Sequence, residues 1–475
     1  MRSQGLKGPS YRFIHGNTKE IINMTKEATS TSTEFSHDLF PRIQPHLYSW
    51  MKLYGKNFLF WKGHKPQIIV SEPELIKEIL GNKNGTYRKS KVDGYLKKLL
   101  GDGLVAAEGQ KWLKQRKLAD HAFHGECLKL MVPAMISSVQ AMLEKWRNYE
   151  SKEIEVWPEI KILTSEVISR TAFGSSYQEG KNIFEMITKL SVIFGRNANN
   201  IQLLNNRKVF RSQDNIESEK LEQSLRGSVL TMIKKREHEV TSGRADNFGN
   251  DFLGSLLTVH HDADQTNRIS VDDMVDECKT FYLAGHETTS TLLSWIILIL
   301  AVHMDWQEKA RKEVLQLFGH ENPTSEGIAR LKTVSMIINE TIRLYSPVLD
   351  MTRRINSKVR LGKYELPANI ELHIPPLALH RNPEIWGEDA YLFKPERFAE
   401  GVAKATKNNP IAFLPFGYGP HTCVGLNFAT NEVKIALSMI LQQHKFTLSP
   451  NYVHSPIHFL TVQPQHGIQI MLHSL

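Results

Sequence analysis

Cysteine is scarce in this sequence of 475 residues. The three cysteines are Cys127, Cys278 and Cys423. So few thiols exclude a disulfide-stapled scaffold and favour a reducing compartment. Cys127 and Cys278 are interpreted as core residues, because a free cysteine packs like a small apolar side chain. Cys423, in contrast, lies in a glycine-rich segment.

Long apolar runs are also missing. A membrane-spanning helix needs about 20 mostly apolar residues. The richest run, Leu292 to Val302, is shorter than that and predicts a buried helix. The chain opens Met-Arg-Ser-Gln-Gly-Leu-Lys-Gly-Pro, which shows neither a secretory signal nor a membrane anchor.

Several common functional motifs are absent too. The chain has no Gly-x-Gly-x-x-Gly, no phosphate-binding loop and no Ser-His-Asp arrangement in a recognisable context. A flavin or nicotinamide domain is therefore not expected within it. His37 and the pair His260-His261 lack the spacing of metal ligands, so no histidine metal site is predicted.

The composition is that of an ordinary globular protein, with 41% hydrophobic and 23% charged residues. This argues against a disordered, collagen-like or coiled-coil chain. The 59 basic and 50 acidic residues give a net charge of +9. That balance suits an acidic partner or an anionic membrane surface, but it is spread too thinly to predict nucleic-acid binding.

Helical periodicity dominates the middle of the chain. The clearest helix begins at Ser270-Val-Asp-Asp, which resembles a capping box, and continues to about Val302. Such a helix would be ~45 Å long and could cross a whole domain. Short β-type runs lie at 58–61, at 68–70 and between 359 and 375. No linker divides the chain, so the sequence predicts one mainly α, α+β domain over residues 1–475.

The most informative motif is Phe416-Gly-Tyr-Gly-Pro-His-Thr-Cys-Val-Gly425. The thiolate of Cys423 is a soft, anionic ligand suited to a haem iron. Gly419 and Gly425 would permit a tight turn around the sulfur, and the N–H groups of that turn could point at it. Phe416 could keep water away from the sulfur. A lone cysteine would favour a structural role, but the full spacing favours a ligand loop.

This segment resembles the haem-ligand loop of the cytochromes P450. Four further segments resemble motifs of that family and occur in its order: Trp112-Leu-Lys-Gln-Arg116, Ala284-Gly-His-Glu-Thr-Thr289, Glu340-Thr-Ile-Arg343 and Pro395-Glu-Arg-Phe398. The resemblance covers nearly the whole chain. It implies the P450 fold, with a long central helix over haem b and with Cys423 as the axial iron ligand. Details of the motifs resemble a plant clan that modifies hormones and terpenoids.

For the long helix, the resemblance implies oxygen activation. Gly285, which lacks a Cβ, would let the backbone approach bound dioxygen. Thr288 would donate a hydrogen bond to the distal oxygen, and Glu287 would relay protons from solvent. Thr289 is interpreted as an ordinary helix polar residue.

A structural role is implied for three other charged residues. Glu340 and Arg343 share one helix face at i and i+3. The resemblance implies that Arg397 completes a buried cluster with them, which braces the loop of Cys423. An exposed helix pair is the simpler alternative.

The two haem propionates need cations or hydrogen-bond donors. Trp112 and Arg116 lie one helical turn apart and could reach one propionate together. Strand alternation lets only one of Arg353 and Arg354 face the haem, and Arg353 is preferred by its offset from the preceding helix. His421 departs from the family, which usually has arginine there. It is shorter and only partly charged, although it can still donate a hydrogen bond.

The resemblance implies a monooxygenase that uses O₂ and electrons from a separate NADPH–cytochrome P450 reductase to oxidise a small lipophilic substrate. A terpenoid, a hormone, a fatty acid and a foreign compound all remain open. Two alternatives are an O₂-independent enzyme that rearranges peroxides and a non-catalytic or decayed haem-binding protein. Residues 1–40 are expected to be a membrane-proximal leader without its anchor helix, at the cytosolic face of the endoplasmic reticulum membrane.

Overall fold

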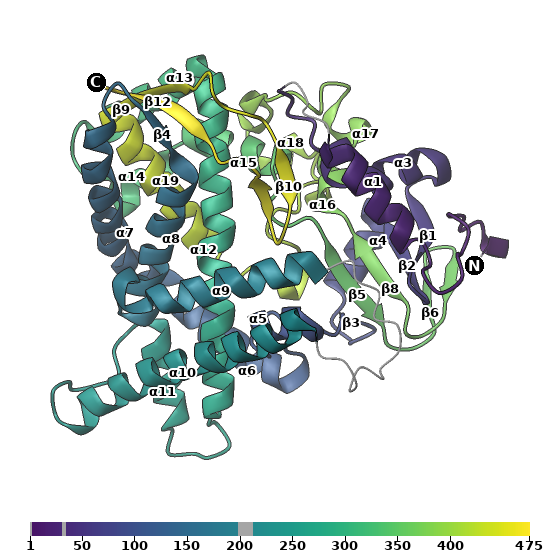
Figure 1. Cartoon of the computed structure of the whole chain (residues 1–475), viewed down its shortest axis with the longest axis horizontal. Coiled ribbons are helices and arrows are strands. Elements are labelled where there is room, and N and C mark those ends of the chain that lie inside the picture. Colours follow the sequence, from purple (N-terminus) through teal and green to yellow (C-terminus); the bar gives the residue numbers. More distant parts are fainter. Residues whose placement is uncertain (1, 31–34, 198–211) are drawn as a thin grey trace.

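The computed structural model describes residues 2–30, 35–197 and 212–475. Helix α12 (Val271–Val302) runs through the helical half of the molecule (Figure 1). Its start confirms the predicted capping box: the Ser270 hydroxyl accepts the Asp273 N–H at 3.0 Å, and the Asp273 carboxylate accepts the Ser270 N–H at 3.2 Å. Acidic residues in the first turn also complement the helix dipole.

Helices α8 (Val156–Phe173) and α19 (Leu426–Gln443) pack against α12, and α7 (Gly125–Trp146) packs against α8 and α19 on the outer side (Figure 1). The ring of Tyr282 on α12 stacks on Phe173 of α8 with centroids 3.9 Å apart. The other α-helices are α1 (Thr18–Ser30), α2 (Phe40–Ile43), α3 (Pro45–Tyr54), α4 (Pro73–Gly81), α5 (Gly94–Leu100), α6 (Gly109–Ala122), α9 (Tyr177–Asn197), α10 (Gln213–Thr241), α11 (Phe252–His260), α13 (Met304–Phe318), α14 (Ser325–Arg330), α15 (Thr333–Leu344), α16 (Pro376–His380), α17 (Pro383–Trp386) and α18 (Val402–Ala405).

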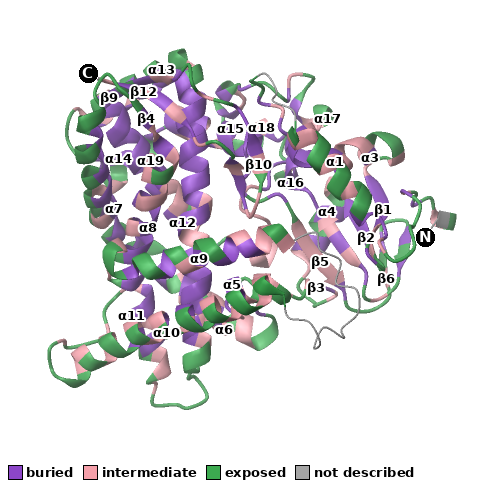
Figure 2. Ribbon diagram, viewed as in Figure 1, coloured by how far each residue is buried: buried purple, intermediate pink, exposed green. Residues whose placement is uncertain are grey.

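Helix α12 is a core helix. From Glu277 to Ala301 every residue is buried except Ala284, Gly285 and Thr288. Figure 2 shows most of this helix in the colour of buried residues. Among the described residues, two helical segments are long and apolar enough to cross a membrane: Gly125–Tyr149 and α12. In α12, 83% of the most apolar window is buried inside the protein, as expected for the interior helix of a globular fold.

A five-stranded sheet occupies the other half of the molecule (Figure 1). Its order is β1 (Asn57–Lys62), β2 (Lys65–Val70), β8 (Glu371–Ile374), β5 (Met351–Ile355) and β3 (Tyr87–Lys89). Only β2 and β8 pair in parallel. Strand β3 pairs with β5 so that Lys89 lies opposite Arg353. Because opposite residues of an antiparallel pair project from the same face, these two cations share one side of the sheet.

The smaller sheets and 3-10 helices complete the fold. The small sheets are β4 (Glu153–Glu155) with β12 (Gln469–Ser474) and β9 (His444–Leu448), β6 (Val359–Leu361) with β7 (Tyr364–Leu366), and β10 (Pro456–His458) with β11 (Val462–Pro464). The 3-10 helices are η1 (Arg2–Gln4), η2 (Arg147–Tyr149), η3 (Pro395–Phe398), η4 (Pro410–Ala412) and η5 (Gly419–His421). The predicted mixture of many helices with a minor β portion is confirmed.

The described part of the leader packs against the sheet. The Leu59 N–H of β1 donates to the Lys7 carbonyl at 2.8 Å, and the Trp61 N–H donates to the Asn17 side chain at 3.0 Å. Both hydrogen bonds hold the N-terminal segment along β1, the outer strand of the sheet. At these two positions the edge of β1 is therefore covered.

The capping box yields a first prediction. Ser270→Ala removes the side-chain acceptor for the Asp273 N–H, so it should destabilise the protein by about 1 kcal/mol. The measurement is the midpoint of thermal unfolding followed by far-ultraviolet circular dichroism. Ser270→Thr keeps a capping hydroxyl and should stay close to the wild type. An unchanged midpoint in Ser270→Ala would show that the cap contributes nothing to stability.

Candidate functional site

The segment before α19 forms a tight loop that packs on α4. Gly419 has φ +75°, and a Cβ built there would lie 2.3 Å from the Leu80 carbonyl oxygen, so only glycine fits. The Cys423 N–H donates to the Phe416 carbonyl at 2.8 Å and closes the loop. Phe416 is half-buried and packs against the main apolar core. The turn predicted around Cys423 is therefore present.

The thiol of Cys423 sits in an unusual environment. Its side chain has exposed surface, yet surrounding protein raises the pKa of the thiol through burial. The Gly425 N–H and the charge of Arg116 act in the opposite direction and favour the thiolate. Helix α19 begins at Leu426, so the positive end of its dipole also lies close to the sulfur.

Gly425 was expected to permit the tight turn around the sulfur, but the turn does not require a glycine at this position. Its φ is −87°, which any residue adopts, and a Cβ there would meet the Cys423 sulfur at an ordinary 3.9 Å. The tight turn depends instead on Gly419 and on Gly417, which also has φ +75°. What Gly425 supplies is its N–H group, directed at the sulfur.

Positive charges gather beside this loop. Lys89, Arg353 and Arg116 all act on His421, and together with burial, the largest cause, they lower its pKa to about 4. The His421 ring packs against Trp112 with centroids 4.2 Å apart. The structure thus brings together all four predicted propionate-binding residues. Arg353, rather than Arg354, is the arginine that acts on His421.

Sequence reasoning missed Lys89. Its ammonium lies 5.7 Å from the centre of the Trp112 ring and donates to the carbonyls of Leu104 and Ala107. Burial and the charge of Arg353 lower its pKa to about 8. Its only signal in the sequence is a lysine at the end of a short strand, and only the register with β5 places it opposite Arg353.

The residues around Cys423 fit a haem. An exposed sulfur lies next to a group of cations, and two of these, Lys89 and Arg353, are partly desolvated. The buried His421 Nδ1 has no hydrogen-bond partner within the described structure. A haem carries an iron that binds thiolate and two carboxylates that bind cations, so it would satisfy both parts of the site.

The centre of α12 supplies a second group of candidate residues. Ala284 and Thr288 lie one turn apart on one face and interrupt the buried stretch. The Thr288 hydroxyl donates to the Ala284 carbonyl at 2.8 Å, the local side-chain bond that competes with regular helix bonding. Thr289 is buried, and its hydroxyl has no partner within the described structure.

Gly285 was expected to let the backbone approach bound dioxygen, but the structure shows a further reason for a glycine here. A Cβ built there would lie 2.6 Å from the Ile168 side chain of α8. Its missing side chain therefore allows α12 to approach α8 closely. This helix-packing role is visible only in the tertiary structure.

Glu287 is buried in a polar network. The hydrogen bond from the Thr288 hydroxyl to the Ala284 carbonyl is not part of this network. Its carboxylate accepts from Thr461 at 3.0 Å and from Gln463, and it lies 3.3 Å from the Lys161 ammonium. Burial alone would raise its pKa, but the charges of Lys161 and His286 outweigh burial and lower it. Glu287 is therefore an ionised carboxylate. Lys161 links it to the surface, since 26% of the lysine side chain is exposed.

The predicted structural cluster is present and buried. Glu340 and Arg343 form a bidentate pair with both N–O distances at 2.7 Å, and both side chains are 0% exposed. The Arg397 Nε lies 3.4 Å from the Glu340 carboxylate, which also accepts the Lys394 N–H at 2.9 Å. The alternative of an exposed helix pair is wrong.

His380 connects this cluster to the cysteine loop and was not predicted. Arg343 donates to the His380 carbonyl at 2.7 Å, and the Leu414 N–H donates to the His380 Nε2 at 3.0 Å. Burial and the charges of Arg343 and Arg381 lower the His380 pKa to about 3. The imidazole is therefore neutral and can accept the hydrogen bond from the Leu414 N–H. Leu414 lies two residues before Phe416 in the cysteine loop.

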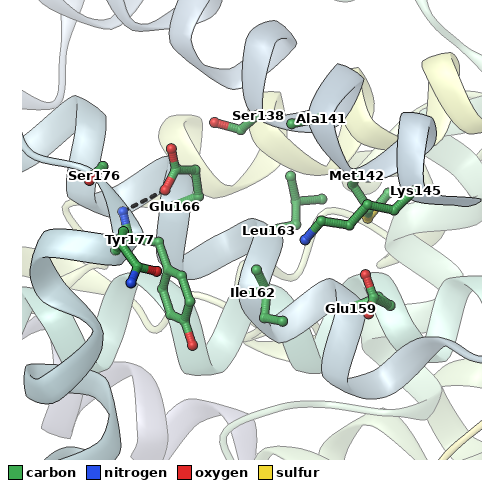
Figure 3. Close-up of a pocket in the computed structure, with 11 residues that line it drawn as sticks. Ser138, Ala141, Met142, Lys145, Glu159, Ile162, Leu163, Glu166, Ser176 and Tyr177 are labelled. Carbon is green, nitrogen blue, oxygen red and sulfur yellow. Dashed lines mark hydrogen bonds between the residues drawn. The ribbon is translucent and has the colours of Figure 1, made fainter.

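A separate pocket of about 210 Å³ lies between α7, α8 and the start of α9 (Figure 3). Its floor is apolar, with Met142, Ile162 and Leu163, and Glu166 accepts the Tyr177 N–H at its rim. None of the residues from the cysteine loop lines it. It is not part of the candidate site.

Comparisons with known proteins identify the family of the chain. The family model described as Cytochrome P450 matches residues 39–472. The chain is 57% identical to Cytochrome P450 CYP749A22 from Panax ginseng, over all of this chain and 91% of that protein. It is 42% identical to 11-oxo-beta-amyrin 30-oxidase from Glycyrrhiza uralensis, over all of this chain and 92% of that protein.

A solved structure shares the fold. It is the crystal structure of cytochrome P450DA heme domain, with a TM-score of 0.79 and 21% identity, and the match covers 92% of this chain and 93% of that one. The family consists of haem-thiolate monooxygenases whose haem iron is bound by a cysteine, and whose reaction needs O₂, a redox partner and a lipophilic substrate. On its sequence, its relatives and its fold, the chain belongs to the cytochrome P450 family.

Proposed function

We propose that this P450 inserts one oxygen atom from O₂ into a terpenoid, with electrons from NADPH–cytochrome P450 reductase, at the cytosolic face of the endoplasmic reticulum membrane. One observation carries the catalytic part: the exposed thiol of Cys423 lies beside the cations Lys89, Arg116 and Arg353. A haem held there supplies the activation of O₂.

The cysteine loop and the cations would hold the cofactor. Cys423 would bind the haem iron, and the Gly425 N–H, which is directed at its sulfur, would temper the charge on it. Trp112, Arg116, Arg353 and Lys89 would bind the two propionates, with His421 as an additional donor. His421 stands where the family usually has arginine, and Lys89 supplies a positive charge that His421, with its lowered pKa, does not.

Two residues of α12 would handle protons. The Thr288 hydroxyl donates to the Ala284 carbonyl and lies on the half-buried face of α12, where it would hold a proton for delivery to the cofactor site. Glu287 holds a negative charge next to Lys161, which reaches the surface. The Lys161 ammonium would give a proton to Glu287 and regain one from solvent. Glu287 would give that proton through water to the Thr288 hydroxyl, which would pass its own proton on.

The substrate class is inferred from relatives. One relative, 42% identical, is named 11-oxo-beta-amyrin 30-oxidase, and another from Catharanthus roseus, 40% identical, is named 7-deoxyloganic acid hydroxylase. Both names describe oxidation of plant terpenoid skeletons. The net charge of +9 supports docking to an acidic reductase and to an anionic membrane surface.

The test of this function uses the purified haem-loaded enzyme with NADPH–cytochrome P450 reductase. The reduced enzyme should give the carbon-monoxide difference spectrum of thiolate-ligated haem, and Cys423→Ser should abolish it. We expect reductase- and O₂-dependent oxidation of 11-oxo-β-amyrin or 7-deoxyloganic acid.

Each other outcome has a definite meaning. Product formed without reductase would indicate a peroxide-rearranging enzyme. Absence of the thiolate spectrum would indicate a non-catalytic haem-binding protein. Oxidation of fatty acids or foreign compounds alone would contradict the terpenoid assignment and leave the monooxygenase assignment intact.

Thr288→Ala tests proton delivery. Loss of the hydroxyl should divert electrons to peroxide, so that product formed per NADPH consumed falls by roughly tenfold or more. The measurement is product, peroxide and NADPH in the same reaction. Thr288→Ser keeps the hydroxyl and should stay near the wild-type ratio. An unchanged ratio in Thr288→Ala would refute the role.

Glu340→Gln tests the buried cluster. It leaves Arg343 and Arg397 with an uncompensated charge, which should cost about 3–5 kcal/mol of stability and reduce haem content. Haem per chain and the thermal midpoint are the measurements. Glu396→Gln changes an exposed acid in the neighbouring Pro-Glu-Arg-Phe segment and serves as the control. Full haem loading of Glu340→Gln would disprove the bracing role.

A further inference from the structure

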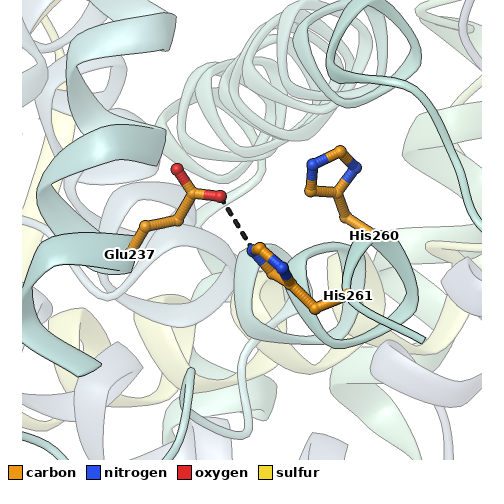
Figure 4. A group of neighbouring side chains, drawn as sticks. All are labelled: Glu237, His260 and His261. Atoms are coloured by element: carbon orange, nitrogen blue, oxygen red, sulfur yellow. Dashed lines mark hydrogen bonds and ion pairs between the residues drawn. The ribbon is translucent and has the colours of Figure 1, made fainter. Parts of the chain in front are cut away.

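Three side chains with metal-binding atoms meet where α10 and α11 lie side by side. Glu237 comes from α10, His260 is the last residue of α11, and His261 follows directly. One ligand atom from each lies within 4.8 Å of those of the other two. Figure 4 shows the Glu237 carboxylate pointing toward the two imidazole rings. The sequence spacing did not predict this, because the third ligand comes from another helix.

The two histidines are held in place by separate contacts. His260 Nδ1 lies 2.7 Å from the Ile269 carbonyl, an arrangement in which Nδ1 carries the proton and Nε2 is left with a free lone pair. A ring nitrogen bonded to a backbone carbonyl is the usual support of a metal-binding histidine. The His261 ring stacks on Phe248 with centroids 5.1 Å apart and planes 13° from parallel.

An ordinary ion pair does not account for the whole group. His261 Nε2 lies 2.9 Å from the Glu237 carboxylate, which satisfies those two residues. The pair leaves the lone pair of His260 unused, although this ring is oriented by its own backbone contact. Two imidazoles and one carboxylate form a donor set that Zn²⁺ accepts, with water in the fourth position.

We propose that Glu237, His260 and His261 bind one Zn²⁺ ion per chain. Ligand atoms on a tetrahedral Zn²⁺ lie about 3.3 Å apart, so closure from 4.8 Å or less needs side-chain movements of about 1 Å. These movements are accessible, since 48% of the His261 side chain and 28% of the Glu237 side chain are exposed.

Occupancy would fix the start of the catalytic helix. Zn²⁺ on His260 Nε2 makes the Nδ1–H a stronger donor to the Ile269 carbonyl. Ile269 immediately precedes Ser270, the N-cap of α12. The ion would therefore hold α10, the end of α11 and the beginning of α12 together, and it would raise the thermal midpoint because the unfolded chain lacks the assembled site.

The experiment is isothermal titration of ZnCl₂ into the haem-loaded enzyme without an affinity tag, since a histidine tag binds zinc itself. We expect one site per chain in the wild type. Glu237→Gln, His260→Gln and His261→Gln should each bind at least about tenfold more weakly, because loss of even an outer-shell partner typically costs that much.

The matched control is His238→Gln. His238 is the neighbour of Glu237 on α10, is exposed, and contacts Arg244 rather than the cluster. It should bind zinc like the wild type. In crystals grown with zinc, anomalous scattering at the zinc edge should show one peak among the three side chains. Absence of stoichiometric binding, wild-type affinity in any of the three variants, or an equal loss in His238→Gln would overturn the proposal.

Discussion

The fold around the haem-ligand loop depends on one buried carboxylate. Glu340 accepts hydrogen bonds from the Nε and Nη2 groups of Arg343 and lies 3.4 Å from Arg397. The site is so deeply buried that water cannot take the place of any partner. A buried charge is tolerated only while its partners are in place, so the three residues hold one another in a single arrangement. That arrangement reaches the cysteine loop through His380, which is kept neutral by burial and by the charges of Arg343 and Arg381. The Glu340 cluster and the cysteine loop are thus linked by a chain of hydrogen bonds.

The two faces of the site carry opposite charge. Beside the cysteine loop, burial and the charges of Lys89, Arg353 and Arg116 lower the pKa of His421. On α12, Glu287 is an ionised carboxylate stabilised by Lys161. Cations therefore concentrate beside Cys423, where we propose that the haem carboxylates bind, and the ionised Glu287 lies on the helix that we propose delivers protons.

Local sequence patterns predicted much of the fold. The capping box of α12, the strands near 58–70 and the helix after Cys423 follow from nearest-neighbour chemistry, and all three are present. The five motifs also identified the family, which the comparisons confirm. What the sequence could not supply were contacts made by register and packing. Lys89 joins the site only because β3 pairs with β5, and Gly285 is explained by Ile168, more than a hundred positions away in the chain.

The same limit explains the histidine pair at the end of α11. Spacing rules find metal sites whose ligands share one helix or one loop, and His260-His261 does not fit them. The third donor, Glu237, is brought by α10, and the support for His260 comes from a carbonyl at the start of α12. Sites of this kind are properties of helix packing. In this P450 the packing that forms the proposed zinc site also sets the N-terminus of α12, the helix that carries Glu287 and Thr288. The zinc site and these two residues are therefore mechanically connected through α12.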